Sequence, residues 1–270
     1  MTVTFAFDPD IVRVGALSIG WHGIFTAVAV FVAVGAGLRG AARVGFSSDR
    51  LTGPLTWAIV GGMVGARLFH LADHLAYYAA HPLEALAIYE GGIAVYGAFI
   101  GGIVAGAIAA RRAGLPIPKL LDIAAPAMLI GQAIGRLGCL SNGDAWGAPT
   151  GTDYGIVYTN PNDRLPADLL GVPTHPYPAY EIVAALALLG LLWLLRRERV
   201  FRVDGQLFAF AALGYAAIRF SLTFFRQETI VWAGLQEAQV ISLVAGAAAI
   251  AALALLPLRA PAQVGGNRAS

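Results

Sequence analysis

Cysteine and charge are both scarce in this sequence. Its 270 residues include a single cysteine, Cys139, and only 13% are charged. One thiol cannot build an internal disulfide framework or a metal site with several thiolate ligands. Soluble domains carry about 25% charged residues. The shortage of charge, together with 58% hydrophobic residues, therefore excludes an ordinary water-soluble globule, a disordered chain and a fibrous repeat.

Several familiar binding signatures are also missing. The net charge is only +2, from 18 basic and 16 acidic residues, so no nucleic-acid partner is expected. The glycine-rich stretch 97–106 lacks the lysine of a P-loop, and no dinucleotide fingerprint or metal-ligand cluster is visible. Residues 1–11 have no basic region, so a removable secretory signal is not expected either. We therefore expect no cofactor and no metal.

Long uncharged runs predict an all-α polytopic membrane protein. Residues 14–38 contain no charged side chain, and a helix of that length, rising about 1.5 Å per residue, crosses a hydrocarbon core of about 30 Å. With it, six further runs predict about seven transmembrane helices: 55–77, 92–110, 120–139, 180–195, 206–224 and 238–258. Together they form one expected transmembrane domain over residues 1–258, followed by a short cytoplasmic tail at 259–270.

The second and third runs are rich in glycine at small-residue spacing. Such spacing lets two helices approach closely in lipid, so we expect these glycines to serve packing. They are Gly61, Gly62 and Gly65 in the second run, and Gly97, Gly101, Gly102 and Gly106 in the third.

Basic residues predict the orientation. One set of loops, with the C-terminus, holds 12 of the 18 Lys and Arg residues, and the opposite set holds 3. Because cytoplasmic loops retain basic residues, the N-terminus is predicted outside and the C-terminus in the cytoplasm. The polar loop 143–178 is the longest connection. It should form a small extracytoplasmic cap, with a strand over 154–158 and a helical turn over 165–170.

Three arginines, Arg67, Arg136 and Arg219, fall within predicted spans. Each costs about 2.5–3.5 kcal/mol at the centre of a membrane helix unless a cavity, partner or ligand offsets it. Snorkelling or pairing with a carboxylate such as Glu181 or Asp144 is one explanation. An anionic ligand held by several helices is the other, because guanidinium donors match phosphate oxygens. Since Arg136 and Arg219 are predicted at the same depth, the second explanation suggests a phospholipid head group.

The densest polar cluster reads G-R-L-G-C-L-S-N-G-D-A-W-G over residues 135–147. It resembles the G-R-[IL]-G-N-F-x-N-G-E-x-W-G signature of the prolipoprotein diacylglyceryl transferase family. Further pieces that fit this family follow in order along about 220 residues: F-D-P at 7–9, I-G-W-H-G at 19–23, E-G-G-I-A-V-Y-G at 90–97, H-P at 175–176 with Y-E at 180–181, and residues 215–219 with F-F-R at 224–226.

The resemblance implies a transferase of the bacterial inner membrane. Its substrates would be phosphatidylglycerol and prolipoprotein signal peptides with a lipobox cysteine, and its second product glycerol phosphate. By matching motif positions, Arg136 would be the phospholipid-binding arginine and Arg219 the second essential arginine. Tyr96 stands where many members have a histidine often described as the base, and His22 stands where a tyrosine is usual.

The sequence also departs from the family pattern. Cys139 replaces the first asparagine of the signature, Asp144 replaces the glutamate, and Ala148 replaces its last arginine. Thr223 stands where a glutamate often follows the second arginine. Cys139 is expected to be a small apolar helix residue, because in this family the reacting thiol belongs to the substrate.

The reaction can be argued from the residues themselves. A thiol that displaces a phosphate ester must lose its proton, and the departing phosphate needs charge stabilisation. Arg136 is expected to hold the phosphate, with Arg219 adding charge. The base stays open among His22, Tyr96 and Asp144, which complete the predicted catalytic set. Asn142, Gly147, Tyr215 and Glu181 join Arg136 as the predicted substrate-binding residues.

Two other functions fit the same residues. A divergent family member could bind phospholipid yet use another acceptor. A transporter of an anionic solute could use the same arginines, although the sequence shows no convincing internal repeat.

Overall fold

The computed structural model describes residues 1–14, 17–86, 92 and 94–259. The chain divides into two compact units, one formed by Met1–Gly37 and Leu121–Ser270, the other by Leu38–Leu120. Each unit is described by itself.

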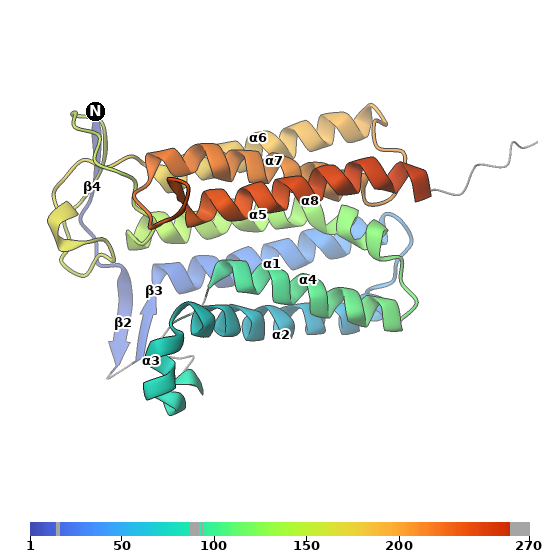
Figure 1. Cartoon of the computed structure of the whole chain (residues 1–270), viewed down its shortest axis with the longest axis horizontal. Helices are drawn as coiled ribbons and strands as arrows, with labels where there is room; N and C mark the ends of the chain where they lie inside the picture. The colour runs from blue at the N-terminus through green and yellow to red at the C-terminus, as the bar shows by residue number, and fades with distance from the viewer. Residues whose placement is uncertain (15–16, 87–91, 93, 260–270) are drawn as a thin grey trace, which may run out of the picture. The chain divides into compact units, whose positions relative to one another are not determined.

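Long helices dominate the chain (Figure 1). Six of the described helices are long and apolar enough to cross a membrane: α1 (Trp21–Ala42), α2 (Ser48–Asp73), α5 (Ile117–Asn142), α6 (Tyr177–Arg197), α7 (Gln206–Leu222, with η4 at Thr223–Phe225) and α8 (Glu237–Arg259). Large apolar side chains on them are exposed, for example Phe31, Val183 and Val244. A helix that is apolar on its outer face suits lipid rather than water. The prediction of an all-α polytopic membrane protein is confirmed.

A seventh helix, α4 (Val95–Arg112), has 18 residues and is not among these six. The count of seven spans therefore stays a prediction. The predicted start of the first span at residue 14 is wrong, because two short strands precede the helix. β2 (Asp10–Val14) pairs antiparallel with β3 (Leu17–Gly20), and α1 begins at Trp21. Absence of charge delimited the run, but it cannot distinguish an uncharged strand from a helix.

The core of the first unit lies among α5, α6 and α7, which run side by side in Figure 1. Ala125 and Leu129 of α5 pack with Ala185, Leu188 and Leu192 of α6 and with Leu207 and Ala211 of α7. Asp122 of α5 accepts hydrogen bonds from the backbone N–H groups of Gly205 and Phe208 at 2.7 and 2.8 Å. This carboxylate therefore satisfies donors at the start of α7 that the helix itself leaves unpaired.

The loop between α5 and α6 folds with the N-terminal strand. β1 (Thr2–Phe5) pairs parallel with β4 (Gly155–Tyr158), followed by the single turn η3 (Ala167–Leu169). Ile156, Tyr158, Leu165 and Leu169 form a small apolar core there. The strand and the helical turn predicted in this loop are thus present. A second hairpin, β5 (Ile230–Trp232) with β6 (Leu235–Gln236), precedes α8.

Charged side chains tie the N-terminal segment to this loop. Oδ2 of Asp10 forms ion pairs with Nη2 of Arg13 at 2.7 Å and with Nη2 of Arg164 at 3.5 Å. Asn162 donates to Asp8 at 2.8 Å. A backbone N–H bond from Asp10 is the largest influence on the Asp8 carboxyl and lowers its pKa.

In the second unit, α2 and α4 pack through glycine. A Cβ built on Gly65 would lie 2.3 Å from the carbonyl oxygen of Gly97, and one on Gly101 would lie 2.2 Å from that of Gly61. Only residues without a side chain allow backbones this close, which agrees with the packing role expected for them. The short helices α3 (Leu75–Ala80) and η1 (Pro82–Leu86) follow α2.

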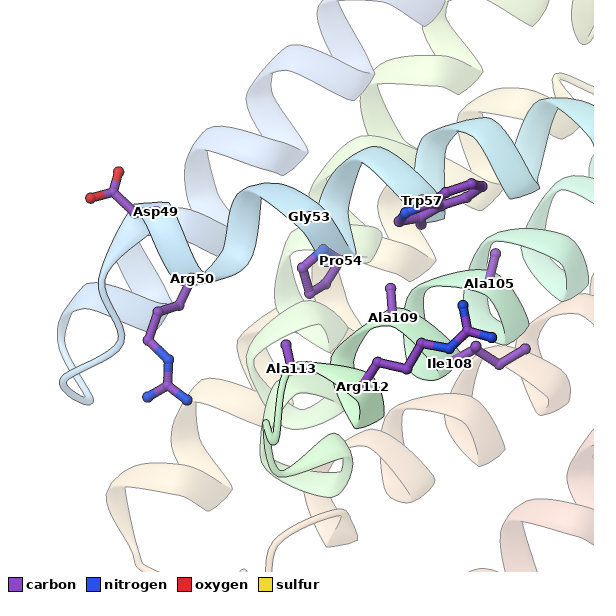
Figure 2. Close-up of a pocket in the computed structure, with 10 residues that line it drawn as sticks. All are labelled: Asp49, Arg50, Gly53, Pro54, Trp57, Ala105, Ile108, Ala109, Arg112 and Ala113. Carbon is purple, nitrogen blue, oxygen red and sulfur yellow. The ribbon is translucent and has the colours of Figure 1, made fainter.

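A groove of about 620 Å³ lies between the first half of α2 and the last part of α4 (Figure 2). Small and apolar residues form most of its lining, and in Figure 2 the Asp49 carboxylate points away from the other labelled residues. The lining residues are Asp49, Arg50, Gly53, Pro54, Trp57, Ala105, Ile108, Ala109, Arg112 and Ala113.

Replacing Gly65 with Ala should destabilise the protein. The added methyl would collide with the Gly97 carbonyl and the Gly101 backbone, neither of which can rotate away. Overpacking of this kind costs about 1–3 kcal/mol. Thermal unfolding of the purified protein in detergent should therefore show a lower Tm. Gly190→Ala in α6, where a Cβ meets nothing within 4 Å, is the matched control and should not lower it. Equal Tm values for the two variants would contradict the packing role.

Candidate functional site

The centre of the candidate site is the carboxylate of Glu181, which lies in the first turns of α6 and is 1% exposed. Its Oε2 pairs with Nε of Arg136 from α5, and its Oε1 lies 3.0 Å from Nη1 of Arg219 from α7. One buried carboxylate thus joins two guanidinium groups from different helices. A carboxylate that accepts from two arginines offsets much of the cost of burying all three charges.

Further groups surround Arg219. Its Nη1 donates to the hydroxyl of Tyr177, and its guanidinium carbon lies 5.6 Å from the centre of that ring. Arg226 lies over the same ring at 5.0 Å. Glu228 then links the two arginines, at 2.6 Å from Arg226 and 3.6 Å from Arg219.

This network carries more positive than negative charge. It contains the guanidinium groups of Arg136, Arg219 and Arg226 and the carboxylates of Glu181 and Glu228. One positive charge is left in excess, and Nε of Arg226 is a buried atom without a hydrogen-bond partner among the described residues. The arrangement is therefore suited to an anion.

Tyr215 lies on α7, one turn before Arg219. Its hydroxyl accepts a 2.7 Å hydrogen bond from the side-chain amide of Gln132, one turn before Arg136 on α5. The bond joins α5 and α7 directly beside the two arginines, so Tyr215 is in place to support them.

A second polar group lies in the same unit, at the junction of α1 and the end of α5. Nδ1 of His22 lies 3.0 Å from Oδ2 of Asp144. The ligand atoms of His22, Asp144 and Cys139 all lie within 4.8 Å of one another. Arg136 connects this group to the arginine network, because its Nη1 lies 3.5 Å from Sγ of Cys139.

Local backbone chemistry fixes Asp144. Gly143 ends α5 with a φ of +70°, a conformation that glycine adopts without strain, and so turns the following residue back. Asn142 then donates to Oδ2 of Asp144 at 2.9 Å. Burial raises the pKa of the Asp144 carboxyl, but the hydrogen bonds from His22, Asn142 and Cys139 outweigh it, so the pKa lies below its ordinary value. Asp144 is thus held as an anion.

Gly147 allows the loop after α5 to pack closely. A Cβ at this position would lie 2.5 Å from the carbonyl oxygen of His175 and 3.0 Å from that of Phe225. The next residue, Ala148, donates its N–H to the carbonyl of Phe225 at 2.8 Å. The loop thereby contacts the segments before α6 and after α7.

Eight of the nine predicted site residues lie in the first unit, where the structure brings them together. The ninth is Tyr96. It lies on α4 in the second unit, where its ring packs at 6.2 Å from that of Phe69. Arg67 is in the second unit as well and donates to backbone carbonyls of Glu84, Ala85 and Gly92 at 2.5–2.9 Å. Carbonyl pairing therefore explains the burial of Arg67. Part of the motif at 90–97 lies outside the described residues.

Sequence reasoning missed four members of the network: Gln132, Tyr177, Arg226 and Glu228. Gln132 lies four residues before Arg136, so helical spacing was a usable signal for it, and membership of the F-F-R motif was one for Arg226. Tyr177 and Glu228 gave no comparable signal. Thr223, by contrast, is fully buried and bonds the carbonyl of Arg219 at 2.6 Å, which is a structural role.

Comparison with known proteins agrees with these features. The family model described as prolipoprotein diacylglyceryl transferase matches residues 9–255. A phosphatidylglycerol–prolipoprotein diacylglyceryl transferase of Synechococcus elongatus is 35% identical over 242 residues, 88% of this chain and 83% of that protein. One of Dehalococcoides mccartyi is 37% identical over 248 residues, covering 90% of this chain and 91% of the relative. The chain therefore belongs to the prolipoprotein diacylglyceryl transferase family.

Proposed function

We propose that this multi-pass inner-membrane protein transfers the diacylglyceryl group of phosphatidylglycerol to the lipobox cysteine thiol of prolipoproteins and releases glycerol phosphate. Membership of the family and the names of its relatives support the transfer and disfavour a transporter. The observation that carries the site assignment is the meeting of Arg136 and Arg219 on Glu181.

The excess charge of the arginine network fits the course of the reaction. The donor phosphodiester carries one negative charge, and the departing glycerol phosphate carries two. Donors placed where charge develops stabilise the transition state more than the ground state. In this proposal Arg136 holds the phosphate, Arg219 and Arg226 add charge, and Glu181 and Tyr177 hold the arginines in position.

The pair formed by His22 and Asp144 supplies the base. The substrate thiol gives its proton to His22, and the new bond joins sulfur to the glycerol carbon of the donor. The bond from that carbon to the phosphate oxygen breaks, and its electron pair leaves with the phosphate. Asp144 orients the imidazole and stabilises the charged form that results, as the carboxylate does in other histidine–carboxylate pairs that act as a general base. Asn142 holds Asp144 in turn.

The proposed topology has seven spans, the loop 143–178 as an extracytoplasmic cap, the N-terminus outside and the C-terminus in the cytoplasm. Pairing of β1 with β4 supports the number of spans, because paired strands lie on the same side of a membrane. An even number of crossings must then separate them. Helices α1, α2 and α5 give three, so α4 has to supply the fourth.

The direct test uses purified protein, phosphatidylglycerol vesicles and a synthetic lipobox peptide, followed by mass spectrometry. The peptide should gain the mass of one diacylglyceryl group, and a peptide with serine in place of the cysteine should gain none. Binding of phosphatidylglycerol without any adduct would instead indicate a family member with another acceptor.

Arg136→Lys should lose most of the turnover. Lysine keeps the charge but cannot copy the forked donors that engage Glu181 and a phosphate together. Loss of one such donor lowers the rate about 10²–10³-fold. Initial rates in the peptide assay measure the effect, with Arg112→Lys at the end of α4 as a control that keeps its rate. Wild-type turnover in Arg136→Lys would contradict the assignment.

His22→Ala should lower the rate about 10²–10⁴-fold, the usual contribution of a positioned base. Free imidazole should restore part of that activity, because it can enter the space left by the side chain. The rate of His81→Ala, in the second unit, should not respond to imidazole. If His22→Ala is fully active, or if imidazole restores nothing, another residue is the base.

A further inference from the structure

The group formed by His22, Cys139 and Asp144 combines three kinds of metal ligand. It offers one imidazole nitrogen, one sulfur and one carboxylate oxygen, all within 4.8 Å of one another. We propose that these residues bind a zinc-type divalent ion and leave one coordination position open; the ion takes the place of the His22–Asp144 contact, so in this metal-bound form His22 does not act as the base.

The ligand chemistry selects the class of ion. Calcium and magnesium prefer shells made of oxygen, whereas nitrogen and thiolate ligands favour zinc and its neighbours among the transition metals. Three protein ligands with a fourth position open to water or another ligand are typical of reactive zinc sites. Such an ion needs ligands that are already close together, and the three described here meet that requirement.

The three ligands are held by independent contacts. Gly138 lets α1 approach α5, because a Cβ there would lie 3.1 Å from the Cα of His22. Gly143 and Asn142 fix Asp144 as described above. Nη1 of Arg136 lies 3.5 Å from the sulfur of Cys139 and holds that side chain in place. The charge of Arg136 itself is balanced by Glu181.

The same group also contains a buried polar atom without a hydrogen-bond partner. Oδ1 of Asp144 is a buried atom that lacks a hydrogen-bond partner among the described residues, whereas Oδ2 of the same carboxylate already contacts Nδ1 of His22 and the amide of Asn142. Burying such atoms is costly unless something else binds them.

Cobalt is a suitable probe, because Co²⁺ occupies zinc sites and its bond to a thiolate gives a near-ultraviolet charge-transfer band. Chelator-treated full-length protein in detergent, in a buffer free of thiols, should develop this band on titration with Co²⁺, and Zn²⁺ should remove it. Cys139→Ser should lack the band, since the chain has no other thiol. His22→Ala and Asp144→Asn should weaken cobalt binding at least about tenfold, because even loss of a supporting residue has that effect.

His74→Ala is the matched control. It disrupts the His70–His74 ring pair of the second unit, which could also attract cobalt, and it should leave the band unchanged. A second measurement needs no variant: Zn²⁺ should slow the labelling of Cys139 by iodoacetamide in the wild-type protein. The proposal would be overturned if the wild-type protein showed no band, if Cys139→Ser kept the band or if His74→Ala lost it. It would also be overturned if Zn²⁺ did not change the rate at which iodoacetamide labels Cys139. None of these measurements depends on transferase activity.

Discussion

The ion pairs of Glu181 with Arg136 and Arg219 are the interaction on which the rest of the site depends. Each arginine would be costly in the membrane alone, and the shared carboxylate offsets that cost while fixing both guanidinium groups at one place. Helices α5, α6 and α7 each supply one member, and the apolar core formed by the same helices holds them together. The packing of these three helices therefore also determines where the three charged groups lie.

Arg136 also couples two chemical environments. On one side it joins a network with an excess of positive charge, which favours an anionic donor. On the other side it lies beside Cys139, His22 and Asp144, where the carboxylate is held as an anion. In the proposed reaction, the groups that would bind the phosphate and the thiol are therefore neighbours, with the Arg136 guanidinium between them. Substitutions at Arg136 should accordingly disturb both halves of the reaction.

Much of this arrangement could be predicted from the sequence, because hydrocarbon imposes a strong length and charge requirement on helices. The spans at 120–139 and 206–224 agree closely with α5 and α7. The hairpin of β2 and β3 was missed, since strands without charge look like the start of a helix. The pairing of Glu181 with both arginines could not be predicted from the sequence either. It depends on the rotation of three helices about their axes, which hydropathy does not report. His22 and Asp144 are separated by more than 120 residues, so only tertiary structure brings them together.

The parallel pairing of β1 with β4 has a consequence for biosynthesis. The strand β1 is translated before its partner β4, and 149 residues lie between them. During that interval, the edge of β1 has no native neighbour, and His22 lacks Asp144. The first unit can therefore complete its fold only late in membrane insertion, once the residues of β4 and Asp144 have been made.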